Sequence, residues 1–565
     1  MIDRMQLIVK VVLSLLILNL LTTFSSIWEP PYLELNFQAG PDFVGLWVAL
    51  LLLIVLFGHI GRGAQALLSG LFLFLTISRG FAEIAPAWFG RDLNLYWDAQ
   101  HLPTFLNVIN QRLPWWQTFG ALVVIGIFLW LFHKLIRSCI AVLAQHAAPY
   151  TLRSPIAMIA TVALLCFPIA NAMKVEAASR YVSSSIFSEY QRQAKLLSSA
   201  FFPNIFPTKL AATPSLKSDL QALNGAEVKV LFLESYGATT YENKDVAKVM
   251  NPARQRFEQA ANAQGRYVLS AYVKAATFGG ASDLSHLSFL SAIDLSNPIH
   301  HDLLLNTSRP TILDTFEQAG YRTIGLYPAM SWEWPEVSFY SFDHYQDAQS
   351  LNYRGPKFGY WTLSDQFSMA RIDEMFPPDP NGKPRFLFYP TINTHLPFKQ
   401  TPPHQPDWSR STTSQPYSEE ATAKVLGDTE WKGMTKGYII SFKYTFDWLT
   451  SYQALPQARE SVMILLGDHQ PAGGIVRKNG SWDVPIHVVT KSKLIAKRMR
   501  DIGFRDGMVE PLPHLGHISE LPLKLLSVFD SKGPTTKTNA SVMEKNTTIS
   551  NGATMANEQT HEKYN

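Results

Sequence analysis

Hydrophobic and polar positions divide the chain into two parts with different patterns. Before about residue 173 charged residues are sparse, and five apolar runs approach the roughly 20 helical residues needed to cross a hydrocarbon core. After that point short apolar runs alternate with stretches of helical periodicity. The pattern predicts a transmembrane anchor at residues 1–173 followed by a domain in water. The five predicted spans are Leu7–Phe24, Val44–Ile60, Ala64–Ile77, Trp116–Leu135 and Ile156–Ala172.

Two of these runs need a further argument. Ala64–Ile77 reaches spanning length only if its helix continues past Arg79 toward Trp88. Leu7–Phe24 lies where a signal peptide would, but it is long and no small-residue cleavage site follows it. The alternative for all five runs is a set of buried core helices, and five such runs in succession rarely occur in a protein that folds in water. We therefore expect a five-helix anchor.

Charges in the short loops predict the orientation of this anchor. Lys and Arg occur at the start of the chain, between the second and third spans, and between the fourth and fifth, whereas the loop after the first span has acidic charges only. Basic loops stay in the cytoplasm, so five crossings would place everything after residue 172 outside. We therefore expect the part of the chain after residue 172 to lie outside the cytoplasm. The basic residues are Arg4, Lys10, Arg62, Lys134, Arg137 and Arg153, and the acidic ones are Glu29, Glu34 and Asp42.

A connector and a tail flank the second half of the chain. Residues 174–226 begin with an amphipathic helical pattern and continue into a proline-containing linker. The helix is expected either to lie in the membrane interface or to pack on the domain that follows. Residues 531–565 are rich in Ser, Thr, Asn and Lys, a composition typical of a disordered tail. The catalytic domain is therefore expected at residues 227–530.

Within residues 227–530 short apolar runs are typical of buried strands, and helical stretches such as Pro310–Ala319 lie between them. This alternation predicts an α/β fold with a mostly parallel sheet between helices. Ligands of such sheets gather beyond the carboxyl ends of the strands. The predicted strands are Val228–Leu233, Thr323–Leu326, Phe386–Tyr389 and Val462–Leu466.

Polar side chains follow three of these strands. Glu234 comes directly after the first strand, Thr391–His395 follows the third, and Asp468 with His469 follows the fourth. A lone histidine after a strand is more often a surface or capping residue, but three strand ends with such groups predict a shared site. Carboxylate oxygen with imidazole nitrogen suits Zn²⁺ or Mn²⁺. The sequence therefore predicts one divalent metal ion at this edge of the sheet.

A nucleophile for such a site is expected in Ala276–Leu295, where a Gly-Gly pair permits a tight turn and apolar residues follow at helical spacing. Ser282 falls at the predicted helix N-terminus, where backbone N–H groups favour bound anions such as phosphate. Metal coordination would lower the pKa of its hydroxyl and make it nucleophilic. The alternative role for Ser282 is a plain N-cap. Thr277 is the second candidate nucleophile, and Ser285 the third.

Charge and cysteine content exclude some classes of protein. The net charge of +4 and a pI near 8.7 give no basis for nucleic-acid binding. The two cysteines, Cys139 and Cys166, both lie in the predicted anchor, so no disulfide framework holds the catalytic domain together. An exported domain can lack disulfides, and the compartment is therefore predicted from the anchor alone.

These motifs together resemble the alkaline phosphatase superfamily, in particular its sulfatase-like branch. That branch includes lipoteichoic acid synthases, phosphoglycerol transferases of periplasmic glucans and lipid A phosphoethanolamine transferases. The resemblance covers about residues 227–530, and the run from Ser282 has the phase of the sulfatase signature C/S-x-P-x-R. It implies that one divalent metal is held by Glu234, Ser282, Asp468 and His469.

The sequence departs from that signature at two positions, because Leu284 replaces the proline and His286 the arginine. A sulfatase depends on the signature for oxidation of its Cys or Ser to formylglycine, so the departure argues against sulfate-ester hydrolysis. The transferases usually use an unmodified threonine, and Ser282 supplies the same hydroxyl. Ala281, one position earlier, offers no nucleophile.

The resemblance also suggests substrate-binding residues, with His286 included among them. His395 is similar to a histidine with which the transferases contact phosphate, and Trp332 is similar to a tryptophan of the head-group pocket in lipoteichoic acid synthases. Trp334 stands where a basic residue is expected, and an indole does not recognise phosphate as a guanidinium does. The choice between glycerol-phosphate and ethanolamine-phosphate therefore stays open. Hydrophobic packing is the alternative role for both tryptophans.

The resemblance implies a two-step transferase with a covalent phospho-Ser282 intermediate. With the orientation predicted above, it also implies a multi-pass protein of the bacterial inner membrane whose catalytic domain is periplasmic. The expected donor is phosphatidylglycerol or phosphatidylethanolamine, and the expected acceptor is an exported glycan or lipid. One alternative is a hydrolase of the same fold, a phosphodiesterase or sulfatase that acts on exported esters. The other is an inactive membrane protein that uses the domain to bind a glycan or an assembly partner.

Overall fold

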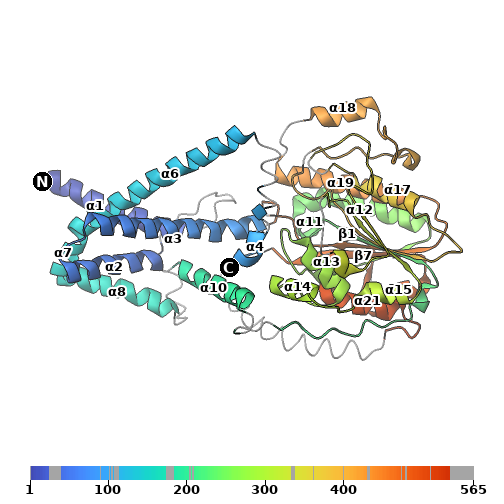
Figure 1. The fold of residues 1–565 in the computed structure, drawn as a ribbon, viewed down its shortest axis with the longest axis horizontal. Helices are drawn as coiled ribbons and strands as arrows, with labels where there is room; N and C mark the ends of the chain where they lie inside the picture. The colour runs from blue at the N-terminus through green and yellow to red at the C-terminus, as the bar shows by residue number, and fades with distance from the viewer. Residues whose placement is uncertain are drawn as a thin grey trace. The chain divides into compact units, whose positions relative to one another are not determined.

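The computed structural model describes residues 2–24, 38, 40–89, 91–100, 102–103, 106, 114–172, 183–202, 205, 209–331, 337–359, 362–398, 400–428, 433–472, 474–476, 480–509 and 511–534. The chain divides into two compact units, Met1–Thr208 and Lys209–Asn565. The first unit is helical, and the second contains a sheet with helices on both faces (Figure 1). Of the predicted tail, the structure describes only residues 531–534.

The first unit consists of helices throughout the residues that the structure describes. Three of them are long and apolar enough to cross a membrane: Met5–Thr23, Arg62–Pro86 and Trp115–Arg153. A fourth, Pro41–Phe57, is apolar but shorter. The helices are α1 (Ile2–Thr23), α2 (Pro41–Phe57), α3 (Arg62–Phe89), α4 (Leu95–Gln100), α6 (Trp115–Val142), α7 (Ala148–Arg153), α8 (Pro155–Ala172) and α10 (Ile186–Phe201), with a π-helical segment, Leu143–Ala147, between α6 and α7.

Each of the five predicted spans lies on a helix, but the described residues give three candidate spans rather than five. The third run does continue past Arg79, because α3 extends to Phe89. Arg79 is accommodated in this helix by Glu83 one turn later, at 2.8 Å. The five-helix anchor therefore stays a prediction, while the described residues include three helices long and apolar enough to cross a membrane.

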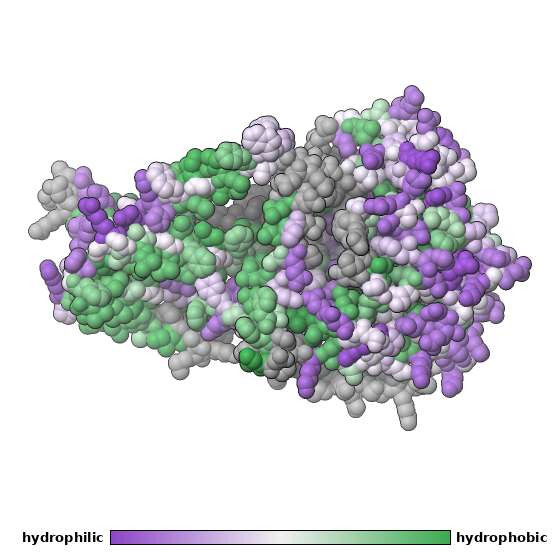
Figure 2. Space-filling view, in the orientation of Figure 1, coloured by the Kyte–Doolittle hydropathy of each residue, from purple (hydrophilic) through white to green (hydrophobic). Residues whose placement is uncertain are grey.

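Large hydrophobic side chains lie exposed on these helices. Leu56 is 70%, Trp115 80% and Ile156 81% exposed. Figure 2 shows hydrophobic residues gathered over the first unit, whereas the visible face of the second unit is largely hydrophilic. Continuous apolar surface of this extent is unfavourable in water and suits lipid.

The amphipathic connector helix packs on the first unit. α10 begins at Ser185, whose Oγ donates to Asp42 Oδ1 at 2.6 Å and also accepts from the N–H of Phe187 as the N-cap. Gln193 on α10 donates to the carbonyl of Leu93 at 2.6 Å. These hydrogen bonds join α10 to other residues of the first unit.

The second unit is an α/β domain whose nine described strands form one mixed sheet in the order β4-β3-β5-β1-β6-β7-β2-β8, with β9 also paired to β2. All pairs from β4 to β6 are parallel, and the pairs β6/β7, β7/β2 and β2/β8 are antiparallel. The four strands predicted from the sequence are β1, β3, β5 and β6, which all belong to the parallel part. The strands are β1 (Glu227–Leu233), β2 (Tyr267–Lys274), β3 (Arg322–Tyr327), β4 (His344–Asp347), β5 (Arg385–Pro390), β6 (Ser461–Gly467), β7 (Asp483–Thr490), β8 (Arg505–Asp506) and β9 (His514–His517).

Alternate residues of the central strands point to opposite faces of the sheet. Leu231 and Leu233 of β1 pack in one core with α12, α17 and α19, while Val228 and Val230 face α13, α15 and α21. Among the other helices, α11 packs beside α12, α14 beside α13, and α20 against β2, β7 and α21. The helices are α11 (Thr239–Glu242), α12 (Lys244–Ala263), α13 (Ser282–Ser291), α14 (Pro298–Leu305), α15 (Ile312–Gln318), α16 (Val337–Tyr340), α17 (Asp365–Met375), α18 (Glu419–Gly427), α19 (Met434–Gln453), α20 (Lys493–Asp501) and α21 (Leu521–Phe529).

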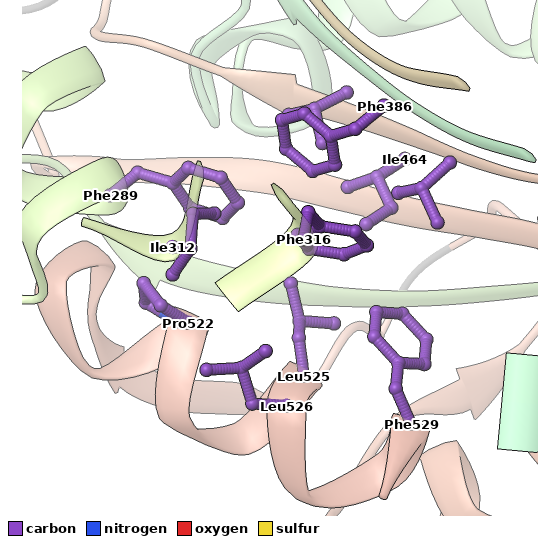
Figure 3. Close-up of a pocket in the computed structure, with 11 residues that line it drawn as sticks. Phe289, Ile312, Phe316, Phe386, Ile464, Pro522, Leu525, Leu526 and Phe529 are labelled. Carbon is purple, nitrogen blue, oxygen red and sulfur yellow. The ribbon is translucent and has the colours of Figure 1, made fainter. Parts of the chain in front are cut away.

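A small apolar cavity of about 10 Å³ lies between the sheet and the helices α13, α15 and α21 (Figure 3). Phe316 of α15 lies in its wall and packs on Phe386 of β5, with ring centroids 4.3 Å apart. A space of this size with only apolar walls stays dry. It is too small for a lipid chain, so we interpret it as a packing gap of the core.

Replacing Phe316 by alanine is expected to destabilise the second unit by about 3–5 kcal/mol, because the cavity already present would grow by most of a phenyl ring. The free energy of unfolding from a denaturant titration measures this. Leu494→Ala is the control, since that side chain is 46% exposed on α20 of the same unit and its loss should change the stability by less than about 0.5 kcal/mol. Equal effects of the two substitutions would contradict the prediction.

Candidate active site

The carboxyl ends of neighbouring strands bring the predicted metal cluster together. β5, β1 and β6 lie side by side in parallel, with Leu233 opposite Gly467 at the ends of β1 and β6. Glu234 follows β1, Asp468 and His469 follow β6, and all three are buried. One ligand atom of each lies within 4.8 Å of the others. In the part of the chain that the structure describes, this is the one group of at least three His, Cys, Asp or Glu side chains with such spacing.

Backbone N–H groups orient Asp468. Its Oδ1 accepts from the N–H of Ser235 at 2.8 Å and from that of His469 at 2.7 Å. The two strand ends approach so closely that a Cβ on Gly467 would lie 1.9 Å from the carbonyl oxygen of Tyr236. The glycine of the Gly-Asp-His motif is therefore needed for the contact that supplies one of these donors.

The ring of His469 is held with Nε2 toward the cluster. Nδ1 donates to the carbonyl of Gln470 at 2.7 Å. Nε2 then lies 3.1 Å from Ser282 Oγ, 3.4 Å from Glu234 Oε1 and 3.7 Å from Asp468 Oδ2. This is the arrangement in which Nε2 can serve as a metal ligand, because the other ring nitrogen fixes the tautomer.

Ser282 is the first residue of α13, as predicted, and its hydroxyl points at the cluster. The Oγ donates to Glu234 Oε2 at 3.1 Å and lies at the same distance from His469 Nε2. The N-cap of the helix is Ala281, which provides no side-chain cap, so Ser282 is not the plain N-cap of the alternative reading. Gly279, Gly280 and Ala281 have φ angles of 68°, 144° and 58°. This left-handed turn directs the start of α13 toward the strand ends.

The two alternative nucleophiles have structural contacts instead. Thr277 is buried, and its hydroxyl donates to the carbonyl of Gly280 at 2.8 Å, within the turn before α13. Ser285 is also buried, and its Oγ accepts from the N–H of Ala276 at 3.2 Å. Of the three candidate hydroxyls, that of Ser282 is the one for which the structure gives hydrogen-bond distances to the cluster.

Burial and mutual charge set the protonation of the cluster. Burial, together with the charge of Glu234, raises the pKa of Asp468 to about 8. Burial opposes the charged form of His469, but the carboxylates of Asp468 and Glu234 outweigh it and raise its pKa to about 9. Burial also opposes ionisation of Glu234, yet the imidazoles of His395 and His469 hold the pKa of Glu234 below its usual value. At neutral pH the cluster thus carries two exchangeable protons beside one ionised carboxylate.

A divalent cation fits this donor set. Asp468 Oδ2 is buried and has no hydrogen-bond partner among the described residues, although buried polar atoms nearly always have one. Two carboxylates, an imidazole nitrogen and a hydroxyl are ligands that Zn²⁺ and Mn²⁺ accept. Replacement of the two protons by one dication would leave the net charge of the cluster unchanged. Glu234, Asp468, His469 and Ser282 are therefore the side chains that would hold the ion.

The affinity for a divalent cation is expected to rise with pH. The folded pKa of Asp468 lies above its ordinary 3.8, and that of His469 above 6.5, so both groups hold protons that the ion must displace. Below about pH 8 the affinity should rise by up to about a hundred-fold per pH unit. The metal-free protein should lose stability as pH rises, because the pKa of Asp468 and that of His469 are both higher in the folded protein than in the unfolded chain. For each group the loss falls between its unfolded and its folded pKa. Thermal melts with and without Mn²⁺ measure both trends; a metal-induced shift that shrinks with rising pH would contradict the prediction.

His395 lies in the loop after β5, near enough to Glu234 for its charge to lower the pKa of that carboxyl. Its Nδ1 donates to the carbonyl of Leu396 at 2.5 Å, which fixes the orientation of the ring. The loop is held by buried Asp365, whose carboxylate accepts from the N–H groups of Ile392 and Asn393 at 2.8 and 3.1 Å. Burial raises the pKa of Asp365 to about 6. The loop after the third predicted strand therefore carries His395 with defined support, and its part in the site stays a prediction.

The other residues predicted to bind substrate are His286, Trp332 and Trp334. His286 lies on α13, 5% exposed, with its Nε2 4.0 Å from Asp468 Oδ2. Burial lowers the pKa of His286 to about 4, so its imidazole is neutral. Trp332 and Trp334 lie outside the described residues.

The sequence patterns assigned no individual role to several residues of the site. Ser235 donates to Glu234 Oε1 at 2.9 Å, and Thr391 accepts from the N–H of Glu234 at 3.1 Å. Gln470 joins neighbouring loops through the N–H of Thr239 and the carbonyl of Ser481. Each directly adjoins a predicted strand-end residue or segment, and that adjacency is the signal that could have identified them.

The fold and the site define an α/β domain with a buried carboxylate–imidazole–serine cluster at the ends of its parallel strands. Comparison with protein families finds that residues 274–485 match the family model described as Sulfatase. The match includes Ser282, His395, Asp468 and His469 and begins after Glu234, and it spans less than half of the chain. It confirms the resemblance to the sulfatase-like branch of the alkaline phosphatase superfamily. A comparison with curated protein sequences finds no match.

Several solved structures are similar to this chain. The integral membrane lipooligosaccharide phosphoethanolamine transferase A of Neisseria meningitidis is 13% identical, covers 87% of this chain and 94% of its own, and has a TM-score of 0.40. The zinc complex of the C-terminal periplasmic domain of EptC from Escherichia coli is 14% identical, with 57% and 92% covered and a TM-score of 0.36. The Streptococcus pyogenes phosphoglycerol transferase GacH, in complex with sn-glycerol-1-phosphate, is 13% identical, with 60% and 82% covered and a TM-score of 0.35. At these values none of them assigns an activity to this chain.

Proposed function

We propose that this protein transfers a phospho-head-group, phosphoglycerol or phosphoethanolamine, from a membrane phospholipid to an exported glycan or lipid. The observation that carries the proposal is the position of Ser282, whose Oγ lies 3.1 Å from both Glu234 Oε2 and His469 Nε2. A hydroxyl held between a carboxylate and an imidazole at a helix N-terminus is arranged for attack on phosphorus. A divalent ion, Zn²⁺ or Mn²⁺, would supply Lewis-acid stabilisation of charge at this site when bound.

In the first step Ser282 Oγ attacks the head-group phosphorus, and its proton leaves toward Glu234 Oε2, to which it is already hydrogen-bonded. The bond from phosphorus to the diacylglycerol oxygen breaks, and that oxygen takes up a proton. In the second step an acceptor hydroxyl attacks the phospho-serine diester, loses its proton, and releases Ser282 with its hydroxyl restored. His395, held by Leu396 beside the cluster, is the group assigned to position the phosphate or to move these protons.

The anchor supports a lipid donor. Apolar helices in the first unit would hold the catalytic domain where lipid head groups are concentrated, which raises their effective concentration. Three crossings and five crossings both place the two ends of the anchor on opposite sides of the membrane. With the basic N-terminus in the cytoplasm, the catalytic domain would lie in the periplasm of a bacterium.

The experiment that tests this proposal follows diacylglycerol release from phospholipid labelled in its acyl chains, with and without a glycan acceptor. Purified protein incubated with donor alone is then digested, and the peptide that contains Ser282 is analysed by mass spectrometry. Diacylglycerol release with an added phosphoglycerol or phosphoethanolamine mass on Ser282 is the expected result. The added mass also identifies which group is transferred.

The proposal has two alternatives with different outcomes in this experiment. A hydrolase of the same fold would release free phosphate, head-group phosphate or sulfate whether or not an acceptor is present. The replacement of Pro and Arg by Leu284 and His286 in the sulfatase signature argues against that alternative. An inactive binding protein would show neither release nor modification, and its function would survive loss of the Ser282 hydroxyl.

A further inference from the structure

Two buried polar atoms beneath the cluster lack a hydrogen-bond partner among the described residues: Asp468 Oδ2 and His286 Nε2. They lie 4.0 Å apart, and their side chains are 1% and 6% exposed. Unsatisfied buried polar atoms destabilise a fold and are rare in native proteins, so two of them side by side require a physical explanation. Ion binding by Asp468 would account for one of the two atoms but not for the histidine.

The surroundings of His286 direct its ring at Asp468. The imidazole packs edge-on against Phe232 of β1 and against Phe388 of β5, with centroid distances of 4.6 and 5.8 Å. These apolar walls offer no hydrogen-bond acceptor. His286 lies four residues after Ser282, so both side chains leave the same face of α13. That face therefore presents a hydroxyl to Glu234 and His469 and an imidazole to Asp468.

Asp468 has one position left for a donor. Its Oδ1 already accepts two backbone N–H groups, from Ser235 and His469. Its Oδ2 has two lone pairs, of which a cation would occupy one. Of the two imidazole nitrogens near Oδ2, that of His469 at 3.7 Å would itself hold the ion, which leaves the second lone pair to His286 Nε2 at 4.0 Å. The separation of 4.0 Å exceeds the roughly 3 Å of a hydrogen bond, so the contact requires the two side chains to close by about 1 Å.

We propose that His286 is the positioning residue of Asp468, and that its Nε2–H donates to the Oδ2 that holds the metal ion. This inference rests on the proposed function, because it assumes that the cluster binds a divalent cation. The hydrogen bond fixes the carboxylate in the orientation that the ion needs. Partners that orient a metal ligand in this way typically contribute about 10–100-fold to metal affinity. His286 stands where the sulfatase signature has an arginine. We thus assign it to the metal ligand Asp468 instead of to the substrate.

The test is calorimetric titration of Mn²⁺ and of Zn²⁺ into the full-length protein in detergent, for His286→Gln and His286→Met. The glutamine amide can donate from about the position of Nε2, whereas methionine has similar length and no donor. We expect a metal Kd within about threefold of the wild type for His286→Gln, and one weakened by about 10–100-fold for His286→Met. Equal affinity of the two variants, whether both are tight or both are weak, would overturn the inference.

Two further variants separate this effect from damage to the helix. Ser291→Ala removes a buried hydroxyl of the same helix that contacts Leu287 and Ile293 only, and its metal affinity should match the wild type. If His286→Met does not fold, His286→Asn takes its place, because its shorter amide mimics Nδ1 and does not reach Asp468; it should bind metal as weakly as expected for methionine. A wild type that binds no divalent metal would instead overturn the metal site of the proposed function.

Discussion

Replacing Ser282 by alanine is expected to lower the rate of head-group transfer by on the order of 10⁴-fold or more, because the attacking oxygen itself is removed. The hydroxyl is the group that lies 3.1 Å from both Glu234 and His469. Metal binding should persist, since two carboxylates and an imidazole remain, with a Kd weakened by about tenfold or less. Labelled diacylglycerol release and metal titration on the same preparation measure the two effects separately.

Ser285→Ala is the matched control for this substitution. Ser285 lies on the same helix and is buried, but its hydroxyl accepts from the N–H of Ala276 rather than contacting the cluster. Its loss should reduce stability by about 1–3 kcal/mol and leave the turnover per folded molecule within a few-fold of the wild type. Full transfer activity in Ser282→Ala, or its loss in Thr277→Ala with the fold intact, would move the nucleophile away from Ser282.

Replacing Asp468 by asparagine is expected to abolish metal binding at micromolar concentrations and, with it, the activity. Divalent metal sites are stabilised by about 10–16 kcal/mol over roughly four ligands, so loss of one charged ligand should weaken the Kd by several hundred-fold. Without metal, however, the variant should melt at a higher temperature than the wild type. Burial next to Glu234 raises the pKa of Asp468 to about 8, so ionisation of this carboxyl opposes folding.

These opposite effects make the substitution diagnostic. Without metal, the melting temperature of Asp468→Asn should be higher than that of the wild type. Excess Mn²⁺ should raise the melting temperature of the wild type but not that of the variant. Asp483→Asn is the control, because that carboxylate pairs with His514 at 2.9 Å and lies outside the cluster of Glu234, Asp468 and His469. It should retain the metal-induced shift of the wild type. If Asp468→Asn keeps that shift, the ion lies elsewhere and the donor set proposed above is wrong.

The parallel part of the sheet was predictable because buried strands are nearly continuous in apolar residues. Val228–Leu233 and Val462–Leu466 lie within β1 and β6 for this reason. The antiparallel part was missed. β2 contains Ser270 and β7 contains His487, which face each other and form a buried hydrogen bond at 2.6 Å. Each of these polar residues finds its hydrogen-bond partner only on the other strand. Each therefore interrupts the apolar run of its own strand, and neither run by itself predicts a buried strand.

The number of membrane crossings is a second feature that the sequence pattern did not determine. Apolar runs predicted where the helices of the first unit lie, because burial in lipid requires a continuous apolar surface. They did not decide how many of those helices cross the membrane, since α2 has 17 residues, close to the minimum length for a span. Length and composition favour three of them in the described chain, and the remaining two depend on packing and tilt that no local pattern records.

The sequence by itself determined the apolar helices, the parallel strands and the polar residues that end those strands, because each depends on local periodicity. The tertiary structure alone decided that Ser282 meets Glu234, 48 residues earlier, and His469, 187 residues later. That meeting depends on the strand order β5-β1-β6 and on the left-handed turn before α13. The tertiary structure also decided that His286 Nε2 lies 4.0 Å from Asp468 Oδ2. A helical pattern shows which residues share a face of the helix, but not which residues that face contacts.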